Sequence, residues 1–249
     1  FKFFLKKALA LGSDFVASGH YVRKALNKSG EFELLKGLDP NKDQSYFLYQ
    51  ITQDQLAKCL FPIGEYQKPQ VRQLAKKFGL ATAGKPDSQG ICFVGEVQIK
   101  EFLKQRIKPE IGDIITSDGK KIGQHDGVWF YTIGQRKGIG IGGGMPYFVV
   151  GKDLANNRLI VARGDQDEAL FSSKMTIGAI HWISGSAPAF PLTCRVKIRY
   201  RQEDQQCEVT ADSKNLEVIF KEKQRAITSG QFAVFYQNDC CLGGGVIIA

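Results

Sequence analysis

The hydrophobic pattern changes its period along the chain, and this change limits the folds that the sequence can adopt. Up to about residue 92, some segments repeat apolar residues at helical spacing and others form short apolar runs, as in α/β domains. From about Met175 to the end, nearly every segment has the alternation of a β-strand. We therefore expect an α/β part, a small β-rich middle part, and a C-terminal β-barrel or sandwich.

Residues that start, stop or turn the chain support this division. Thr52 and Gln55 have the spacing of a capping box, and Pro69 suits the first turn of a helix that ends at Gly79. The apolar spacing further predicts helices over residues 1–12 and 97–107, a strand over 15–17, and turns at 118–119 and 156–157. We place the three domains at residues 1–95, 96–168 and 169–249.

Composition excludes several classes of protein and favours a polyanionic partner. No uncharged apolar run approaches the roughly 18 residues of a membrane-spanning helix. With 34 Lys and Arg against 25 Asp and Glu, the formal net charge is +9, which favours nucleic acid as the partner. The chain starts with Phe1 and enters a helical pattern at once, so we expect it to be cut from a longer protein.

The cysteines and histidines are too scattered for a metal site. None of the six cysteines forms a C-x-x-C pair and the three histidines lie far apart, so we expect no zinc. Scattered cysteines in a chain of 249 residues fit a reducing cytoplasm.

Cys92 is the cysteine whose surroundings suit chemistry. It lies between Gly90 and Gly95 after a polar run and before a predicted helix, whose free amides would stabilise a thiolate. The alternative is a small buried apolar side chain, which is the commoner role of a free cysteine. The other five cysteines fall in helical or strand patterns, and we interpret them as structural: Cys59, Cys194, Cys207, Cys240 and Cys241.

Three further segments allow both a binding role and a plain structural one. In residues 38–48, Lys42 suits a phosphate and Gln44 a base edge or sugar, while Asp39 or Asn41 could simply cap a helix. The glycine-rich segment 132–144 lacks the G-K-[ST] ending of a phosphate loop and is followed by strand residues, so it is either a basic loop over RNA or a β-connection.

The third segment is the basic run 194–201. Strand alternation would place Arg195, Lys197, Arg199 and Arg201 on one face, opposite Cys194, Val196, Ile198 and Tyr200. Four like charges on one face repel unless an anion screens them, so we consider a phosphate backbone and a solvated outer face as the alternatives.

Taken together, these segments resemble the tRNA-specific 2-thiouridylase (MnmA) family. The matching pieces follow the family order over essentially the whole chain: residues 17–23, 42–48, 61–64, 87–93, 132–138, 199–202 and 241–245. The resemblance implies a partial PP-loop ATP-pyrophosphatase-like α/β domain, then the β-rich middle domain and the barrel. It also implies an enzyme that replaces the C2 oxygen of the wobble uridine of tRNA with sulfur, using ATP, with Mg²⁺ expected, and a sulfur-donor or relay protein.

Site residues follow from the resemblance by position. Cys92 falls on the cysteine that carries the persulfide, and Gly19 on a residue that lines the ATP site. The tRNA contacts fall on His20, Lys42, Asp43, Gln44, Arg199, Tyr200 and Gln231.

The sequence also departs from the family pattern. The phosphate-binding loop S-G-G-x-D-S and the first catalytic cysteine do not occur in it. We therefore expect a fragment that is inactive by itself and neither hydrolyses ATP nor adenylates tRNA. The main alternative is a non-catalytic RNA-binding protein with a translation-factor-like β-barrel. A thiol-based redox protein around Cys92 is disfavoured, because no second cysteine lies nearby in the sequence.

Overall fold

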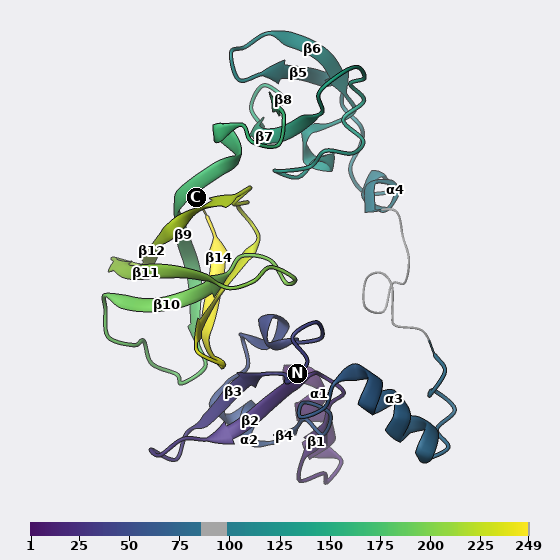
Figure 1. The fold of residues 1–249 in the computed structure, drawn as a ribbon, viewed down its shortest axis with the longest axis vertical. Helices are drawn as coiled ribbons and strands as arrows, with labels where there is room; N and C mark the ends of the chain where they lie inside the picture. The colour runs from purple at the N-terminus through teal and green to yellow at the C-terminus, as the bar shows by residue number, and fades with distance from the viewer. Residues whose placement is uncertain (86–98, 249) are drawn as a thin grey trace. The chain divides into compact units, whose positions relative to one another are not determined.

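A computed structural model of the chain describes residues 1–85 and 99–248, which form two compact units (Figure 1). The first unit holds residues 1–85, 174–222 and 229–248, and the described residues of the second are 99–173 and 223–228. Cys92 and the segment 87–95 around it lie outside the described residues.

Local capping signals fix the helices of the first unit. Gly12 takes a φ of +85° and Gly79 one of +63°, and each follows the end of a helix, where glycine reaches this conformation without strain. Thr52 and Gln55 form the predicted capping box, and Pro69 lies in the first turn of its helix. These predictions are confirmed by the helices α1 (Lys2–Ala10), α2 (Gln53–Ala57) and α3 (Lys68–Lys77). In the described ranges, no helix has both the length and the apolarity needed to cross a bilayer.

A short parallel pair and an antiparallel hairpin complete the N-terminal part. The strand predicted over residues 15–17 is β1 (Val16–Ala17), which pairs in parallel with β4 (Cys59–Leu60). The hairpin consists of β2 (Val22–Leu26) and β3 (Phe32–Lys36). A 3₁₀ helix, η1 (Ser45–Leu48), follows the hairpin.

The C-terminal strands close into a six-stranded barrel, as predicted (Figure 1). Its order is β13-β10-β11-β12-β9-β14, and β14 pairs with β13 to close the ring. The strands are β9 (Phe171–Trp182), β10 (Leu192–Lys197), β11 (Gln205–Asp212), β12 (Asn215–Arg225), β13 (Phe232–Gln237) and β14 (Cys240–Ile247).

The barrel and the N-terminal hairpin share one core. β3 pairs with β14, with Leu35 opposite Cys240 and Leu34 opposite Cys241. Leu34 is fully buried in one cluster with Tyr46 of η1 and Tyr236 of β13. Within the barrel, Gly243 allows β14 to pack closely on β9, because a Cβ there would lie 2.1 Å from the carbonyl oxygen of His181.

The second unit is built on a four-stranded sheet of order β6-β5-β8-β7. The predicted turns are confirmed: Gly119 takes a φ of +87° between β5 and β6, and Asn157 one of +49° between β7 and β8. The sheet buries Ile114, Leu159 and Val161. Its strands are β5 (Gly112–Thr116), β6 (Lys121–His125), β7 (Tyr147–Asp153) and β8 (Arg158–Arg163), and the short helices are α4 (Ile99–Lys104), η2 (Val128–Phe130) and η3 (Glu168–Leu170).

The helix predicted over residues 97–107 is wrong at its C-terminal end, because α4 ends at Lys104. The chain then tightens into a turn in which both Arg106 and Ile107 donate backbone hydrogen bonds to the carbonyl oxygen of Leu103. Leu103 and Ile107 both pack against the core of the sheet, which holds the chain in this turn.

The glycine-rich segment 132–144 forms an anchored connection between η2 and β7. The Gly134 N–H donates to the Val149 oxygen at 2.7 Å, and the Val149 N–H donates to the Gln135 oxygen at 3.0 Å. Ile139 is buried in the core of the sheet. These contacts support the β-connection, and a contact with RNA stays a prediction.

Candidate nucleic-acid interface

Two aspartates organise the loop that carries Lys42 and Gln44. Asp39 accepts hydrogen bonds from the Asn41 N–H at 3.0 Å and the Lys68 N–H at 2.9 Å. Asp43 accepts the Ser45 N–H at 3.1 Å, so it satisfies the first amide of η1. Asp39 therefore binds the first backbone amide of α3, and Asp43 binds that of η1. The helix-capping role suggested for Asp39 is thus present at α3, whereas the N-cap residue of η1 is Gln44, whose side chain makes no capping hydrogen bond.

The Asp43 carboxylate is buried and saturated by groups of this chain. Besides the Ser45 N–H, it accepts the Gly37 N–H at 3.2 Å, the Ser45 hydroxyl at 3.0 Å and the Lys197 ammonium at 3.1 Å. The exposed fractions of the Asp43 and Lys197 side chains are only 3% and 11%. Asp43 therefore ties the loop to the end of β10, and its contact with tRNA stays a prediction.

Gln44 joins the same loop to the segment that follows β1. Its backbone N–H donates to the Tyr21 oxygen at 3.1 Å, and its side-chain oxygen accepts the Tyr21 N–H at 3.0 Å. His20 precedes Tyr21, and its Nδ1 lies 2.5 Å from the Ser18 hydroxyl. Burial lowers the pKa of His20, which favours the neutral imidazole. The structure thus brings His20 and Gln44, 24 residues apart in the sequence, to one place.

Gly19 lies beside His20 and is exposed. A Cβ at Gly19 would meet no atom within 4 Å, so a ligand has room to approach the backbone there. In the part of the chain that the structure describes, no glycine-rich loop leads into the N-terminus of a helix, the arrangement that holds nucleotide phosphates. The role of Gly19 in an ATP site therefore stays a prediction.

The prediction of four charges on one strand face over residues 194–201 is wrong. β10 ends at Lys197, and the chain then turns, with the Gln202 N–H donating to the Arg199 oxygen at 3.2 Å. The two basic side chains within β10, Arg195 and Lys197, are neutralised by carboxylates of this chain. Asp43 pairs with Lys197, and Asp204 accepts a hydrogen bond from Arg195 Nε at 2.6 Å.

Asp204 also pairs with Lys36 of β3, so it connects the hairpin to the barrel. Burial acts to raise the pKa of Asp204, but hydrogen bonds from Lys36 and Arg195 outweigh it and hold the pKa below its usual value. The free energy gained from this lowered pKa is present above the pKa of the unfolded chain, about 3.9. It is lost as the pH falls through the lower pKa of the folded state.

We therefore expect Asp204→Asn to lower the free energy of unfolding at pH 7, with the difference from the unmodified chain disappearing as the pH falls below about 4. Urea unfolding between pH 7 and pH 3 measures this. Asp239→Asn is the matched control, because Asp239 pairs with Arg23 but is 64% exposed, and exposed pairs contribute little. Equal pH dependence in Asp204→Asn and the unmodified chain would contradict the role of Asp204.

The turn after β10 presents Arg199, Tyr200 and Arg201 next to η1. Arg199 and Arg201 are exposed, and the half-buried ring of Tyr200 lies 4.3 Å from the ring of Phe47, centroid to centroid. Burial raises the pKa of Tyr200, so its hydroxyl stays protonated. The turn and the loop from Gly37 to Asp43 border a charged hollow of about 740 Å³. Two segments about 160 residues apart in the sequence thus border the same hollow.

Gln231 is exposed just before β13, and its carbonyl oxygen accepts the Ile247 N–H at 2.8 Å. The next residue, Phe232, accepts a hydrogen bond from the Tyr46 hydroxyl at 3.0 Å. η1 is therefore fixed to the first residue of β13, which follows Gln231.

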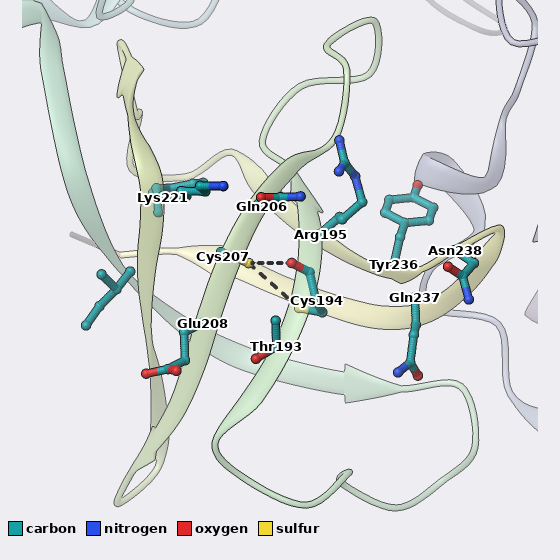
Figure 2. Close-up of a pocket in the computed structure, with 12 residues that line it drawn as sticks. Thr193, Cys194, Arg195, Gln206, Cys207, Glu208, Lys221, Tyr236, Gln237 and Asn238 are labelled. Carbon is teal, nitrogen blue, oxygen red and sulfur yellow. Dashed lines mark hydrogen bonds between the residues drawn. The ribbon is translucent and has the colours of Figure 1, made fainter.

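The five cysteines within the described residues all lie in strands, where the sequence predicts helical or strand segments. Cys194 and Cys207 face each other across β10 and β11, with their sulfur atoms 3.7 Å apart (Figure 2). Their mutual hydrogen bond and burial raise the pKa of Cys207, and burial raises the pKa of Cys240 to about 11. Raised thiol pKa values leave little thiolate at neutral pH, which supports structural roles.

Phe47 is the feature of this surface that sequence reasoning missed. It lies within the segment 42–48, but an aromatic residue beside Tyr46 and Leu48 reads as one more core position. The ion pairs of Asp43 and Asp204 were missed as well, since their partners lie up to 168 residues away and leave no local pattern.

Comparisons with known proteins agree with this arrangement. Three family models match in order: the tRNA methyl transferase HUP domain at residues 1–96, the tRNA methyl transferase PRC-barrel domain at 100–163, and the aminomethyltransferase beta-barrel domain at 172–247. They confirm the α/β, β-rich and barrel order that the sequence predicts.

Three similar curated relatives are each named tRNA-specific 2-thiouridylase MnmA. The protein of Marinomonas sp. (strain MWYL1) is 52% identical over 99% of this chain and 65% of its own length. The protein of Pseudomonas aeruginosa (strain UCBPP-PA14) is 50% identical over 99% of this chain and 67% of its own length. The protein of Pasteurella multocida (strain Pm70) is 52% identical over 99% of this chain and 66% of its own length. The chain therefore spans about two thirds of the length of these relatives. With half of its residues identical over nearly its whole length, the chain belongs to the tRNA-specific 2-thiouridylase family.

Proposed function

We propose that the protein containing this chain thiolates tRNA, replacing the C2 oxygen of the wobble uridine with sulfur. The names of relatives about 50% identical to the chain support this proposal. ATP, with Mg²⁺, supplies the activation that turns the C2 oxygen into a leaving group. Gly19 would line one side of the ATP site, where its backbone leaves room for a ligand. The protein would have three domains in this chain, at residues 1–95, 96–168 and 169–249.

The chain's own chemical contribution would be the sulfur carried by Cys92. The terminal sulfur of a persulfide at Cys92 would attack C2 of the adenylated uridine, and the C2–O bond would break as AMP leaves. A second thiolate would then attack Cys92 Sγ, which releases the thiouridine and joins the two cysteines in a disulfide. A donor or relay protein would load the persulfide. A cytoplasmic location would keep the other cysteines reduced.

One observation carries the binding part of this proposal. The residues expected to contact tRNA come from segments at both ends of the chain, and three of them lie at or next to a partner of η1. Gln44 precedes η1, Tyr200 packs on Phe47 of η1, and the residue after Gln231 accepts a hydrogen bond from Tyr46 of η1. Arg199 and Arg201 add exposed positive charge there, in a chain whose net charge is +9. Phosphate groups of RNA suit such a surface.

Changing Arg199 and Arg201 together to glutamate is therefore expected to weaken tRNA binding roughly tenfold or more, since cations that neutralise phosphates are removed and repulsion is added. The unmodified chain should bind in the micromolar range or more weakly, with affinity that falls steeply with salt. The slope of log affinity against log salt should become shallower by about 0.9 for each phosphate that the protein no longer neutralises. Filter binding at several salt concentrations, with several tRNA sequences, measures both quantities.

The matched control changes the exposed Lys214 and Lys221 to glutamate, which gives the same net charge elsewhere on the barrel. A similar loss of affinity in both variants would mean that overall charge, and not this turn, controls binding. Binding that does not depend on salt, or no binding at low salt, would contradict the proposed surface.

A further inference from the structure

Phe47 is exposed, and two neighbouring aromatic rings pack against its ring and position it. Its side chain is 54% exposed, whereas its neighbours Tyr46 and Leu48 are buried. The ring packs against Tyr200 at 4.3 Å and 39°, and against the edge of Tyr46 at 5.7 Å and 82°. Tyr46 is itself fixed by the hydrogen bond from its hydroxyl to the Phe232 oxygen. A positioned aromatic residue is thus more than half exposed.

The surroundings of Phe47 combine positive charge with groups that form hydrogen bonds. The exposed Arg199 and Arg201 flank Tyr200 in the sequence. Phe47 also borders a hollow of about 520 Å³, and the polar residues that line this hollow include Gln50, Gln55 and His181. The His181 ring is oriented by the Ile51 carbonyl oxygen, 3.1 Å from its Nε2.

We propose that Phe47, backed by Tyr200, is a stacking platform for one unpaired nucleobase of the bound RNA. Aromatic rings beside a positively charged surface are how proteins hold unstacked bases, because every base offers a π-face while its phosphates seek cations. A base on Phe47 would have its edge near the polar lining of the hollow. This inference rests on the proposed function and adds that a single-stranded part of the tRNA, rather than a paired one, meets η1.

Binding measurements on the chain with an unmodified tRNA transcript test the platform. Phe47→Ala is expected to weaken binding roughly five- to hundredfold, the range for removal of one base–aromatic stack. Phe47→Trp should bind as tightly as the unmodified chain, and Phe47→Leu should behave like the alanine variant although it keeps an apolar side chain. The salt slope should not change, because no phosphate contact is removed.

Phe78→Ala is the matched control, since Phe78 is 68% exposed at the C-terminal end of α3 and is expected to leave the affinity unchanged. A fully paired RNA duplex should bind the unmodified and Phe47→Ala chains equally, because its bases are stacked inside the helix. Photo-crosslinking of a transcript that carries 5-iodouridine should label the peptide with Phe47 or the one with Tyr200. A purely structural role of Phe47 would give no such crosslink.

Two failures are distinguishable. An unmodified chain that does not bind the transcript would overturn the proposed function and the platform with it. An unmodified chain that binds, with Phe47→Ala and Phe47→Leu equally tight, would overturn the platform alone and leave Phe47 as a contact for a protein partner or for none.

Discussion

Replacing Cys92 with serine is expected to abolish 2-thiouridine formation by the protein that contains this chain, while its affinity for tRNA stays within about twofold. A serine oxygen cannot carry the transferable sulfur of a persulfide, so no sulfur reaches C2 of the uridine. The tRNA contacts that the family resemblance implies are other residues, so the affinity should depend little on Cys92. Nucleoside mass spectrometry of the tRNA measures thiolation, and filter binding measures affinity.

Cys240→Ser is the matched control for this experiment. Cys240 is the least buried of the five cysteines in the described residues, and burial raises its thiol pKa to about 11, so little thiolate forms at neutral pH. Turnover of Cys240→Ser should stay within a few-fold of the unmodified protein. Normal turnover by Cys92→Ser would assign the persulfide to another cysteine and leave Cys92 a structural residue.

Replacing Lys197 with methionine is expected to lower the free energy of unfolding by about 3–5 kcal/mol, the usual cost of removing one partner of a buried ion pair. The Asp43 carboxylate would remain buried with only neutral donors. Lys197 also lies over the ring of Tyr236, 5.3 Å from its centroid, so the substitution removes a cation–π interaction as well. Urea unfolding monitored by circular dichroism measures the change.

Two variants make this second prediction specific. Lys174→Met removes one partner of the exposed Lys174–Glu217 pair and should cost no more than about 1 kcal/mol. Adding Asp43→Asn to Lys197→Met removes the uncompensated charge and should recover part of the stability. If Lys197→Met were no more destabilising than Lys174→Met, the Asp43–Lys197 pair would not be what holds the loop to β10.

Local structure was predictable from sequence where local groups decide it. The capping box at Thr52 and the stop at Gly79 depend on residues within one helical turn, and both are present. The turn at Asn157 likewise needs only its own backbone conformation and the strands beside it. The family models confirm the order of the three parts.

Contacts between distant segments were not predictable in this way. Strand alternation predicts that Lys197 lies on a charged outer face. In the structure Lys197 is buried instead, because its ammonium pairs with the buried carboxylate of Asp43, 154 residues away in the sequence. The same applies to Asp204, which neutralises Arg195 and reaches Lys36 on β3. The hydrophobic period of a strand shows which of its residues share a face. It does not show which carboxylate from another segment will lie against that face.

Some residues of the candidate site were predictable from the sequence and others were not. Resemblance supplied the positions of Gln44 and Tyr200, and folding explains why they meet, since β3 joins the barrel through β14 and η1 packs against the turn after β10. Phe47 needed the structure, because only its exposure distinguishes it from Tyr46.

The most direct test of the central claim is mass spectrometry of tRNA nucleosides after incubation with the protein that contains this chain, ATP, Mg²⁺ and a persulfide donor. The account predicts 2-thiouridine at the wobble position, none without ATP, and none with Cys92→Ser. Tight, salt-dependent binding of tRNA with no 2-thiouridine under any of these conditions would contradict it and identify a non-catalytic RNA-binding protein.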